Sequence, residues 1–260
     1  MELVMKGRNA LVTGASLGIG FAISQKFALA GANVAMVARR AETLEASRRA
    51  IEQKASTKIV AIAGDVSKAE DCNRAFETAV KTLGSVDVIV NNAGTSQTAK
   101  FESITDEIWQ ADIDLKLFAA IRLIRLAFPG MRERRFGRII NVLNIGAKAP
   151  EGGRAPTAVS RAAGMALTKV LAGEGAPHNI LVNALLVGRI ESDQWVQRHA
   201  REGKNTSLDG YYAEMGKQIP LGRIGTADEF AGMALFLASQ AGSYITGTAI
   251  NIDGGLCPVV

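Results

Sequence analysis

The stretch that decides the fold reads TGASLGIG and spans residues 13–20. It follows a short apolar run, Ala10 to Val12, and leads into a helical pattern from Gly20 to Ala30. Glycines let a backbone turn sharply and pass close to a ligand, and a helix start offers unpaired N–H groups and the positive end of the helix dipole. The stretch therefore predicts a strand–turn–helix unit that binds a pyrophosphate, with contacts from Gly14, Ser16, Gly18, Ile19 and Gly20.

The same alternation of apolar runs and helical patterns continues along the chain. The predicted strands are Ala10 to Val12, Val34 to Val37, Ile59 to Ile62, Val86 to Val90, Ile139 to Val142, Ile180 to Leu185 and Ala249 to Ile252. The predicted helices are Gly20 to Ala30, Thr43 to Lys54, Lys68 to Leu83, Thr105 to Met131, Thr157 to Gly173 and Thr226 to Ser239. This order predicts an α/β fold in one domain over residues 1–260: a Rossmann fold with a doubly wound, seven-stranded parallel sheet and helices on both faces.

One long segment, residues 187–219, breaks the alternation. It is polar, we expect it to be irregular, and it follows the sixth predicted strand. Because ligands bind outside the carboxyl ends of the strands in an open α/β sheet, an insert there is expected to act as a substrate lid.

Composition excludes several classes of protein. The 260 residues are 48% hydrophobic and 21% charged, which is typical of a globular protein. The two cysteines, Cys72 and Cys257, lie far apart with no Cys/His cluster, so we expect neither a disulfide framework nor a metal site. No signal-peptide pattern and no apolar run of about 18 residues is present, so we expect no membrane association and a cytoplasmic location.

The formal net charge is +5, and the densest basic cluster lies between a helix and a strand. We interpret this cluster, Arg132, Arg134, Arg135 and Arg138, as a solvated helix end favoured by the helix dipole. Aromatic residues make up only 5% of the chain and none interleaves with these arginines, so nucleic acid is not expected as a partner.

Three further strand ends carry residues suited to a dinucleotide. Arg39 and Arg40 follow the second strand, where a residue that hydrogen-bonds the ribose 2′-hydroxyl of NAD(H) would be acidic. A guanidinium suits a 2′-phosphate instead, which favours NADP(H) over NAD(H). Asp65 follows the third strand, where its carboxylate can meet the adenine amino group. The small residues after the fourth strand, Asn92, Ala93 and Gly94, leave room for the adenosine half of the cofactor.

With these motifs in place, the whole chain resembles a short-chain dehydrogenase/reductase of the 3-oxoacyl-[acyl-carrier-protein] reductase kind. The resemblance rests on Gly14, Gly18 and Gly20, on Asp65 and Val66, on Asn91 to Gly94, and on Tyr244 to Gly247 followed by Asp253 to Gly255. It implies adenine contacts from Asp65 and Val66. It also implies a homodimer or homotetramer that pairs through the long helices at 105–131 and 157–173 and through the last strand.

The chain departs from this family where the family carries its catalytic asparagine, serine, tyrosine and lysine. By resemblance, these four positions fall on Asp114, Asn144, Thr157 and Arg161. A neighbouring cation can lower the pKa of a phenol toward neutrality, but it cannot do so for an aliphatic hydroxyl, so Thr157 can orient a substrate but cannot act as a general acid at neutral pH. Arg161 stays cationic and can bind the nicotinamide ribose. We hypothesise that Asp114 and Arg161 form a direct or water-bridged salt bridge.

Other residues are then considered as a proton source. Tyr211 and Tyr212 lie in the expected lid, and Lys148 and Glu151 lie in the loop after the fifth predicted strand. By resemblance, Ile190 and Ser192 lie on the nicotinamide side of the cofactor, after a turn in which Val187 replaces the family's proline.

Three functions remain open from the sequence. The leading one is an NADP(H)-dependent oxidoreductase that acts on a carbonyl substrate with a non-standard active site. The second is a catalytically inactive NADP(H)-binding subunit or sensor. The third is a non-redox lyase or isomerase that uses Asp114, Lys148 or Glu151 for proton transfer.

Overall fold

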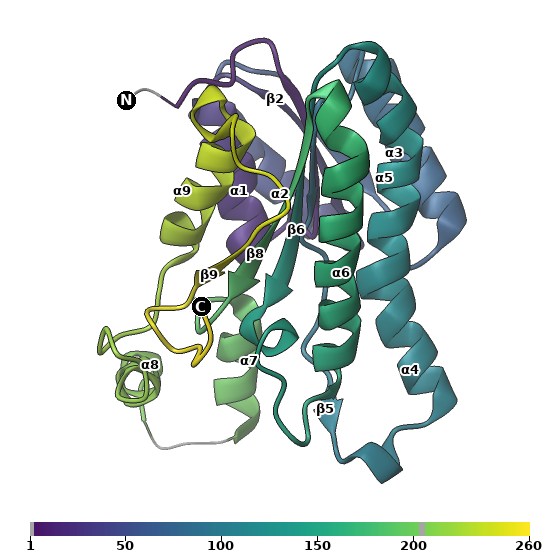
Figure 1. Ribbon diagram of the computed structural model, residues 1–260. Coiled ribbons are helices and arrows are strands. Elements are labelled where there is room, and N and C mark those ends of the chain that lie inside the picture. Colours follow the sequence, from purple (N-terminus) through teal and green to yellow (C-terminus); the bar gives the residue numbers. More distant parts are fainter. Residues whose placement is uncertain (1–2, 203–205) are drawn as a thin grey trace.

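Seven parallel strands form the central sheet of the computed structural model, which describes residues 3–202 and 206–260 (Figure 1). Their order across the sheet is β3-β2-β1-β4-β6-β8-β9, which confirms the predicted doubly wound topology. The strands are β1 (Asn9–Thr13), β2 (Asn33–Ala38), β3 (Ile59–Ala63), β4 (Val88–Asn91), β6 (Gly137–Asn144), β8 (Ile180–Val187) and β9 (Ala249–Ile252). β1 and β4 are buried along their whole length because helices cover both faces of the sheet.

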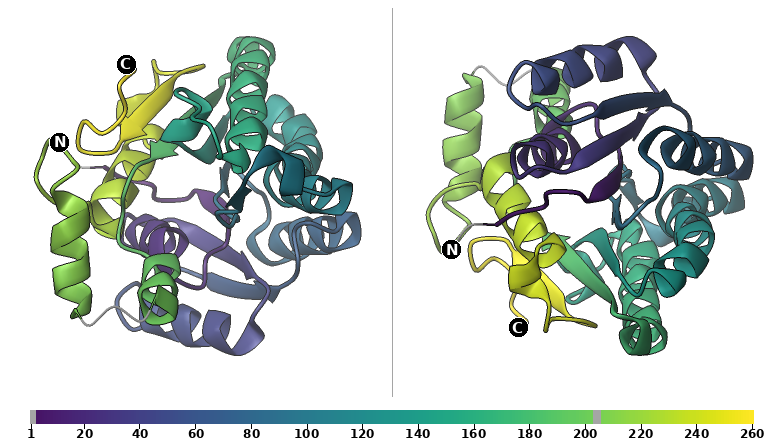
Figure 2. Two further views of the ribbon diagram at one scale, coloured as in Figure 1. Left: turned by 90° about the horizontal axis from the view of Figure 1, so that it is seen from below. Right: turned by 90° about the horizontal axis from the view of Figure 1, so that it is seen from above.

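Two layers of helices enclose the sheet. One face carries α1 (Gly18–Leu29), α2 (Ala41–Glu52) and α9 (Ala227–Ala238), whose side chains Phe27, Leu44 and Phe230 share one core cluster. The other face carries α3 (Ala69–Leu83), α5 (Ala119–Glu133) and α6 (Thr157–Gly175). Figure 2 shows both layers from the two ends of the sheet. The shorter elements are β5 (Thr98–Ala99), η1 (Phe101–Ser103), η3 (Ile145–Ala147), β7 (Ala155–Pro156), η4 (Ala176–His178) and η5 (Gln240–Gly242).

The helix predicted from Thr105 to Met131 is not continuous. It consists of α4 (Asp106–Ile113), a π-helical turn η2 (Asp114–Phe118) and then α5. The wider turn holds one extra residue, so side chains on either side of it do not follow the spacing of an α-helix. This change of spacing decides which side chain faces α6.

The segment predicted to be irregular, residues 187–219, contains two helices. These are α7 (Asp193–Glu202) and α8 (Leu208–Gly216), while residues 203–205 lie outside the described part of the chain. Tyr211 and Met215 of α8 pack with Ile219 and Ile224 in a small apolar cluster that Trp195 of α7 joins. Burial of these side chains explains why the segment forms helices despite its polar composition.

The interpretation of the arginine cluster as a solvated helix end is wrong for Arg138. Its side chain is only 2% exposed, and its guanidinium lies 4.4 Å from the ring centre of Phe136. Nη1 of Arg138 donates to the carbonyl oxygens of Gly137 and Asn179, and burial lowers the pKa of the guanidinium to about 10. Arg132, Arg134 and Arg135 are exposed, as expected.

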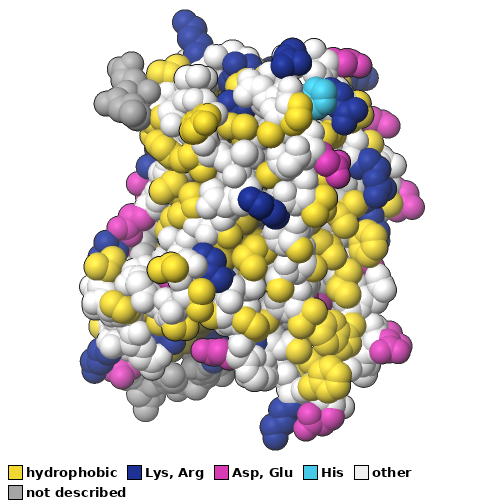
Figure 3. Space-filling model, viewed as in Figure 1, with side chains coloured by type: hydrophobic (Ala, Val, Ile, Leu, Met, Phe, Trp, Pro, Cys, Tyr) yellow, Lys and Arg dark blue, Asp and Glu magenta, His cyan; other side chains and the backbone are white. Residues whose placement is uncertain are grey.

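The space-filling view shows hydrophobic side chains over α5 and α6 (Figure 3). A groove between these two helices is lined by Ile121, Ile124, Phe128, Pro129, Leu167 and Leu171, with Arg125, Arg132, Glu133 and Glu174 also in its walls. Among the described residues, no helix combines the length and the apolar character that crossing a membrane requires.

Candidate functional site

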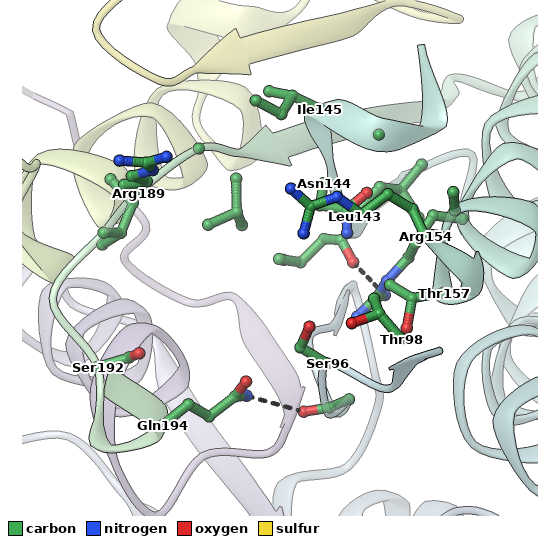
Figure 4. Close-up of a pocket in the computed structure, with 18 of the residues that line it drawn as sticks. Ser96, Thr98, Leu143, Asn144, Ile145, Arg154, Thr157, Arg189, Ser192 and Gln194 are labelled. Atoms are coloured by element: carbon green, nitrogen blue, oxygen red, sulfur yellow. Dashed lines mark hydrogen bonds between the residues drawn. The ribbon is translucent and has the colours of Figure 1, made fainter. Parts of the chain in front are cut away.

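A pocket of about 380 Å³ lies at the carboxyl ends of the strands (Figure 4). Its walls come from the start of α1, the loop after β4, the end of β6 and the loop that follows it, the start of α6, and the segment that follows β8. This is the edge where ligands bind in an open α/β sheet, so the topology alone places the site here.

The turn after β1 is tied to the end of β4 by Thr13 and Asn92. The Thr13 hydroxyl accepts hydrogen bonds from the backbone N–H groups of Asn92 and Ala93, each at 3.0 Å. The Asn92 side chain donates to the carbonyl oxygens of Thr13 at 3.0 Å and Gly14 at 3.1 Å. The predicted pyrophosphate turn and the predicted adenosine wall therefore form one rigid unit.

The turn is so tight that it requires glycine. A Cβ on Gly20 would lie 2.2 Å from the carbonyl oxygen of Gly14, which no side chain can tolerate. Gly18, with a φ of +55°, borders open space, because a Cβ there would meet only Ser192, at 3.8 Å. Ser192 lines the pocket together with Ile19 and Ile190, whereas Ser16 is buried and its carbonyl oxygen accepts a hydrogen bond from Ser47. An open gap beside a glycine turn and a helix start fits a dinucleotide pyrophosphate.

Arg39 and Arg40 are exposed between β2 and α2. Nη2 of Arg40 lies 4.0 Å from a carboxylate oxygen of Asp193 on α7, so this arginine faces the segment after β8. Asp65 follows β3 and accepts two hydrogen bonds from Ser67, and Val66 beside it is buried. These positions fit the adenosine end of a dinucleotide cofactor.

Thr157 begins α6 and lines the pocket with a side chain that is almost fully buried. Its hydroxyl donates to the carbonyl oxygen of Gln97 at 2.6 Å and accepts from the backbone N–H of Gln97 at 3.0 Å. It also accepts a hydrogen bond from Nζ of Lys116 at 2.7 Å. The Thr157 hydroxyl is therefore in direct contact with the ammonium group of a lysine.

Lys116 was not identified from the sequence. Its side chain is fully buried in the π-helical turn η2, where it pairs with the carboxylate of Asp112 one turn earlier. The other carboxylate oxygen of Asp112 accepts from the Ser160 hydroxyl at 2.6 Å. The four-residue spacing of Asp112 and Lys116 on a predicted helix is the signal that could have identified this pair.

The surroundings of Lys116 shift its proton affinity. Burial lowers the pKa of Lys116 to about 8, the hydrogen bond to Asp112 opposes this shift, and the nearby Arg161 guanidinium adds to it. An ammonium group with a pKa of about 8 carries its proton at neutral pH and releases it more readily than an ordinary lysine. The site thus contains a proton donor next to a hydroxyl that lines the pocket.

The hypothesis of a direct salt bridge between Asp114 and Arg161 is wrong. Asp114 accepts from Nη2 of Arg122 at 3.1 Å and from the Gln110 amide at 2.9 Å. The carboxylate that acts electrostatically on Arg161 is that of Asp112. The extra residue of the π-helical turn explains the difference, because it places Asp112 and Lys116 toward α6 and Asp114 toward Arg122.

Arg161 lies in the wall of the pocket, one turn of α6 after Thr157. Its Nη1 donates to the carbonyl oxygen of Val142 at 2.7 Å, and a Cβ on Gly94 would lie 2.4 Å from its Nη2. Burial lowers the pKa of Arg161 to about 10, and the charge of Asp112 opposes this shift. The guanidinium therefore remains charged at neutral pH beside the predicted adenosine wall.

Asn144 ends β6 and lines the pocket beside Thr157 and Arg154 (Figure 4). Its side-chain oxygen is buried and has no hydrogen-bond partner among the described residues. A buried acceptor of this kind is costly unless a ligand or a water supplies the missing donor, so Asn144 is a candidate contact for a bound molecule.

The residues proposed as alternative proton sources divide into two groups. Glu151 lines the pocket, whereas Tyr211, Tyr212 and Lys148 are absent from its described walls. Tyr211 is buried in the apolar cluster of α8, and burial raises the pKa of Tyr212. Nζ of Lys148 donates to the carbonyl oxygen of Ala249. The structure brings Trp195, rather than either tyrosine, to the pocket from the segment after β8.

Within the described ranges, no group of three or more His, Cys, Asp or Glu side chains is arranged to hold a metal ion.

A parallel sheet with a glycine turn and a pocket at its carboxyl edge defines the class of dinucleotide-binding α/β proteins. A family model described as enoyl-(acyl carrier protein) reductase matches residues 14–257. An acetoacetyl-CoA reductase from Shinella zoogloeoides is 37% identical over 248 residues, covering 95% of this chain and 98% of the relative. The chain belongs to the short-chain dehydrogenase/reductase family.

Two solved structures are closely similar over the whole chain. L-sorbose reductase from Gluconobacter frateurii, complexed with NADPH and L-sorbose, has a TM-score of 0.95 and 32% identity and covers 100% of both chains. An NADPH-bound short-chain oxidoreductase from Pseudomonas aeruginosa PAO1, described as containing an atypical catalytic center, has a TM-score of 0.91 and 35% identity. This alignment covers 99% of the present chain and 100% of the relative.

Proposed function

We propose that this protein is an NADPH-dependent reductase of a carbonyl substrate in which Lys116 and Thr157 together replace the family's tyrosine as the source of the proton. The observation that carries the proposal is the 2.7 Å hydrogen bond from Nζ of Lys116 to the Thr157 hydroxyl, at the wall of the pocket. The proposal keeps Thr157 and Arg161 as site residues and assigns to Lys116 the place expected for Asp114.

The chemistry divides between cofactor and protein. When bound, NADPH supplies a hydride to the carbonyl carbon. The Thr157 hydroxyl gives its proton to the carbonyl oxygen as that oxygen becomes an alkoxide, and Lys116 replaces this proton from Nζ. The Thr157 hydroxyl leaves its bond to Gln97 for this step, while the backbone N–H of Gln97 still holds the oxygen in place. Asp112 and Ser160 hold Lys116 in position.

Other residues are assigned to binding. Arg161 is proposed to hold the nicotinamide ribose, and Ser192 and Ile190 are proposed to border the nicotinamide carboxamide; all three line the pocket. Arg39 and Arg40 are proposed to bind a 2′-phosphate, which favours NADPH over NADH; two similar structures were solved with NADPH. The segment 187–219 is proposed to cover the substrate, since Gln194 of α7 already donates to the carbonyl oxygen of Gly94 across the site.

The experiment compares two substitutions of Thr157 in NADPH oxidation assays with a panel of ketones and aldehydes. Thr157→Val keeps the shape but removes the hydroxyl and is expected to lower kcat about 100-fold or more. Thr157→Ser keeps the hydroxyl and is the matched control, with most of the activity retained. Equal rates for Thr157→Val and wild type, with NADPH binding intact, would contradict the Lys116–Thr157 proton path.

A second function is favoured by the commitment of the Thr157 hydroxyl to the Gln97 carbonyl oxygen at 2.6 Å. If that bond never breaks, the protein is a non-catalytic NADPH-binding subunit that acts through a partner. Tight calorimetric binding of NADPH together with no oxidation across the whole panel would identify this function and exclude the reductase.

A further inference from the structure

Positively charged side chains outnumber negatively charged ones in the described walls of the pocket. Among the described residues, the walls carry the three arginines Arg154, Arg161 and Arg189 and a single carboxylate, that of Glu151. A concave site with this balance attracts anions, because its low-dielectric walls concentrate the positive field. The nature of the ligand then depends on which arginine is available to bind it.

Two of the arginines are bound into the walls. Arg161 donates to the carbonyl oxygen of Val142 and is assigned to the cofactor ribose. Arg189 donates to the carbonyl oxygen of Met215 at 3.0 Å and to Oε1 of Gln218 at 2.6 Å, which joins it to the segment at the end of α8. Neither is available to a substrate without loss of these contacts.

Arg154 differs from both. Its side chain is 57% exposed and pairs with Glu151 at 3.2 Å, while the Glu151 side chain is itself 72% exposed. Solvent screens an exposed ion pair of this kind and makes it weak, so a ligand carboxylate can replace Glu151 at Arg154 at little cost. Figure 4 shows the Arg154 side chain reaching from the loop before α6 into the pocket.

The backbone of Arg154 is fixed relative to the reacting hydroxyl. Its carbonyl oxygen accepts a hydrogen bond of 2.9 Å from the N–H of Ala158, the residue after Thr157. The backbone of Arg154 and that of Thr157 therefore belong to one local framework at the start of α6. Because both side chains line the same pocket, an anionic group at Arg154 and a carbonyl beside Thr157 can belong to one small molecule.

Asn144 adds an independent requirement. Its buried side-chain oxygen lacks a donor among the described residues, and the hydroxyl formed when a ketone is reduced is such a donor. The pocket thus presents a cation for an anionic group and an acceptor for the hydroxyl of the product. A hydrocarbon ketone would leave the cation unused.

We propose that the substrate is a small oxo acid whose carboxylate is bound by Arg154, so that Arg154 determines specificity for anionic over neutral carbonyl compounds. This proposal rests on the reductase function proposed above. A planar guanidinium makes two parallel charge-assisted hydrogen bonds to a carboxylate, which fixes both the position and the orientation of the oxo group.

The test is steady-state kinetics with matched pairs of 2-oxo and 3-oxo acids and their methyl esters. Arg154→Gln is expected to raise KM for the acids about 10- to 100-fold, with a smaller change in kcat and no change for the esters. Glu151→Gln frees Arg154 from its internal partner and is expected to lower KM for the acids. Arg49→Gln on α2, an equally simple loss of an exposed and paired arginine, is the matched control and should change neither.

The outcomes separate this proposal from the reductase function. Equal effects of Arg154→Gln on acids and esters would overturn the carboxylate assignment and leave the reductase intact. Acetoacetyl coenzyme A, whose anionic groups are phosphates, is a further substrate for this comparison. If Arg154→Gln raised KM for this substrate alone, the carboxylate assignment would also be overturned. Calorimetric binding of succinate, but not of its dimethyl ester, to the protein–NADPH complex, lost in Arg154→Gln, would support the anion site even if no oxo compound were reduced.

Discussion

Lys116 shows how one residue's surroundings change what a neighbouring group can do. A threonine hydroxyl alone is not a general acid at neutral pH, but here it accepts a hydrogen bond from a lysine whose pKa burial lowers to about 8. Asp112 on α4 stabilises the charged form of Lys116, and Arg161 on α6 destabilises it. In the proposed reaction, Lys116 and Thr157 together supply the proton that a single tyrosine supplies in the family.

The pH dependence of reduction follows from the direction of this shift. Reduction needs Lys116 protonated, so kcat is expected to be constant below about pH 7 and to fall as pH rises through 8. The reverse oxidation needs Lys116 neutral and is expected to rise over the same range. Rates measured in both directions from pH 6 to 10 check this, and two flat profiles would rule out Lys116 as the proton source.

The 2′-phosphate assignment is tested at Arg39 and Arg40. Replacing both by alanine removes charge-assisted hydrogen bonds and is expected to weaken NADPH binding about 10- to 100-fold, with NADH binding nearly unchanged. Calorimetric titration with each cofactor measures this difference, with Arg49→Ala on the following helix α2 as the control. An equal loss of affinity for both cofactors would show that the two arginines do not bind the 2′-phosphate.

At the scale of single elements, the π-helical turn η2 and the first turn of α6 set the positions of Lys116, Thr157 and Arg161 in the site. The turn η2 directs Lys116 to Thr157, and the first turn of α6 presents Thr157 and Arg161 on one side. Both effects are local, since each depends on how many residues a single helical turn contains.

The glycine turn predicts a contrast between two substitutions. Gly20→Ala is expected to lower thermal stability and abolish NADPH binding, because its Cβ would collide with the Gly14 carbonyl oxygen. Gly232→Ala in α9 has no atom within 4 Å of the new Cβ and is expected to stabilise the helix by about 0.5–1 kcal/mol. Thermal unfolding of both variants checks the pair; a stable, cofactor-binding Gly20→Ala protein would contradict the tight-turn account.

At the scale of the whole molecule, the apolar groove between α5 and α6 is the surface on which the family resemblance predicts subunit pairing. Leucine and phenylalanine side chains on one exposed face would be buried from water if two copies of the chain paired symmetrically through this groove. The groove lies away from the pocket, so pairing there would leave the site open.

Leu171→Asp is expected to reduce the assembly to a smaller species, because it places a charge at the centre of this groove. Light scattering coupled to size-exclusion chromatography measures the mass. Leu29→Asp, at an exposed position at the end of α1, is the control. An unchanged mass for Leu171→Asp would place the subunit contact elsewhere or show that the protein is a monomer.

Much of the fold was predictable because it depends on local patterns. The apolar runs matched all seven strands of the main sheet to within a few residues, since buried parallel strands are apolar on both faces. The glycine turn was predictable for the same reason, because its chemistry lies within eight consecutive residues.

Which residues form the site, in contrast, is decided by contacts between segments that lie far apart in the sequence. Helical periodicity cannot reveal a single π-helical turn, so Asp114 was placed where the folded chain brings Lys116, and the partners of Arg161 were assigned wrongly. Tyr211 and Tyr212 were considered as proton sources in the expected lid, but packing of α8 places them outside the described walls of the pocket. The residues of a strand or turn act on their neighbours in the chain, whereas a lowered lysine pKa arises only when tertiary packing buries that lysine beside a threonine 41 residues away.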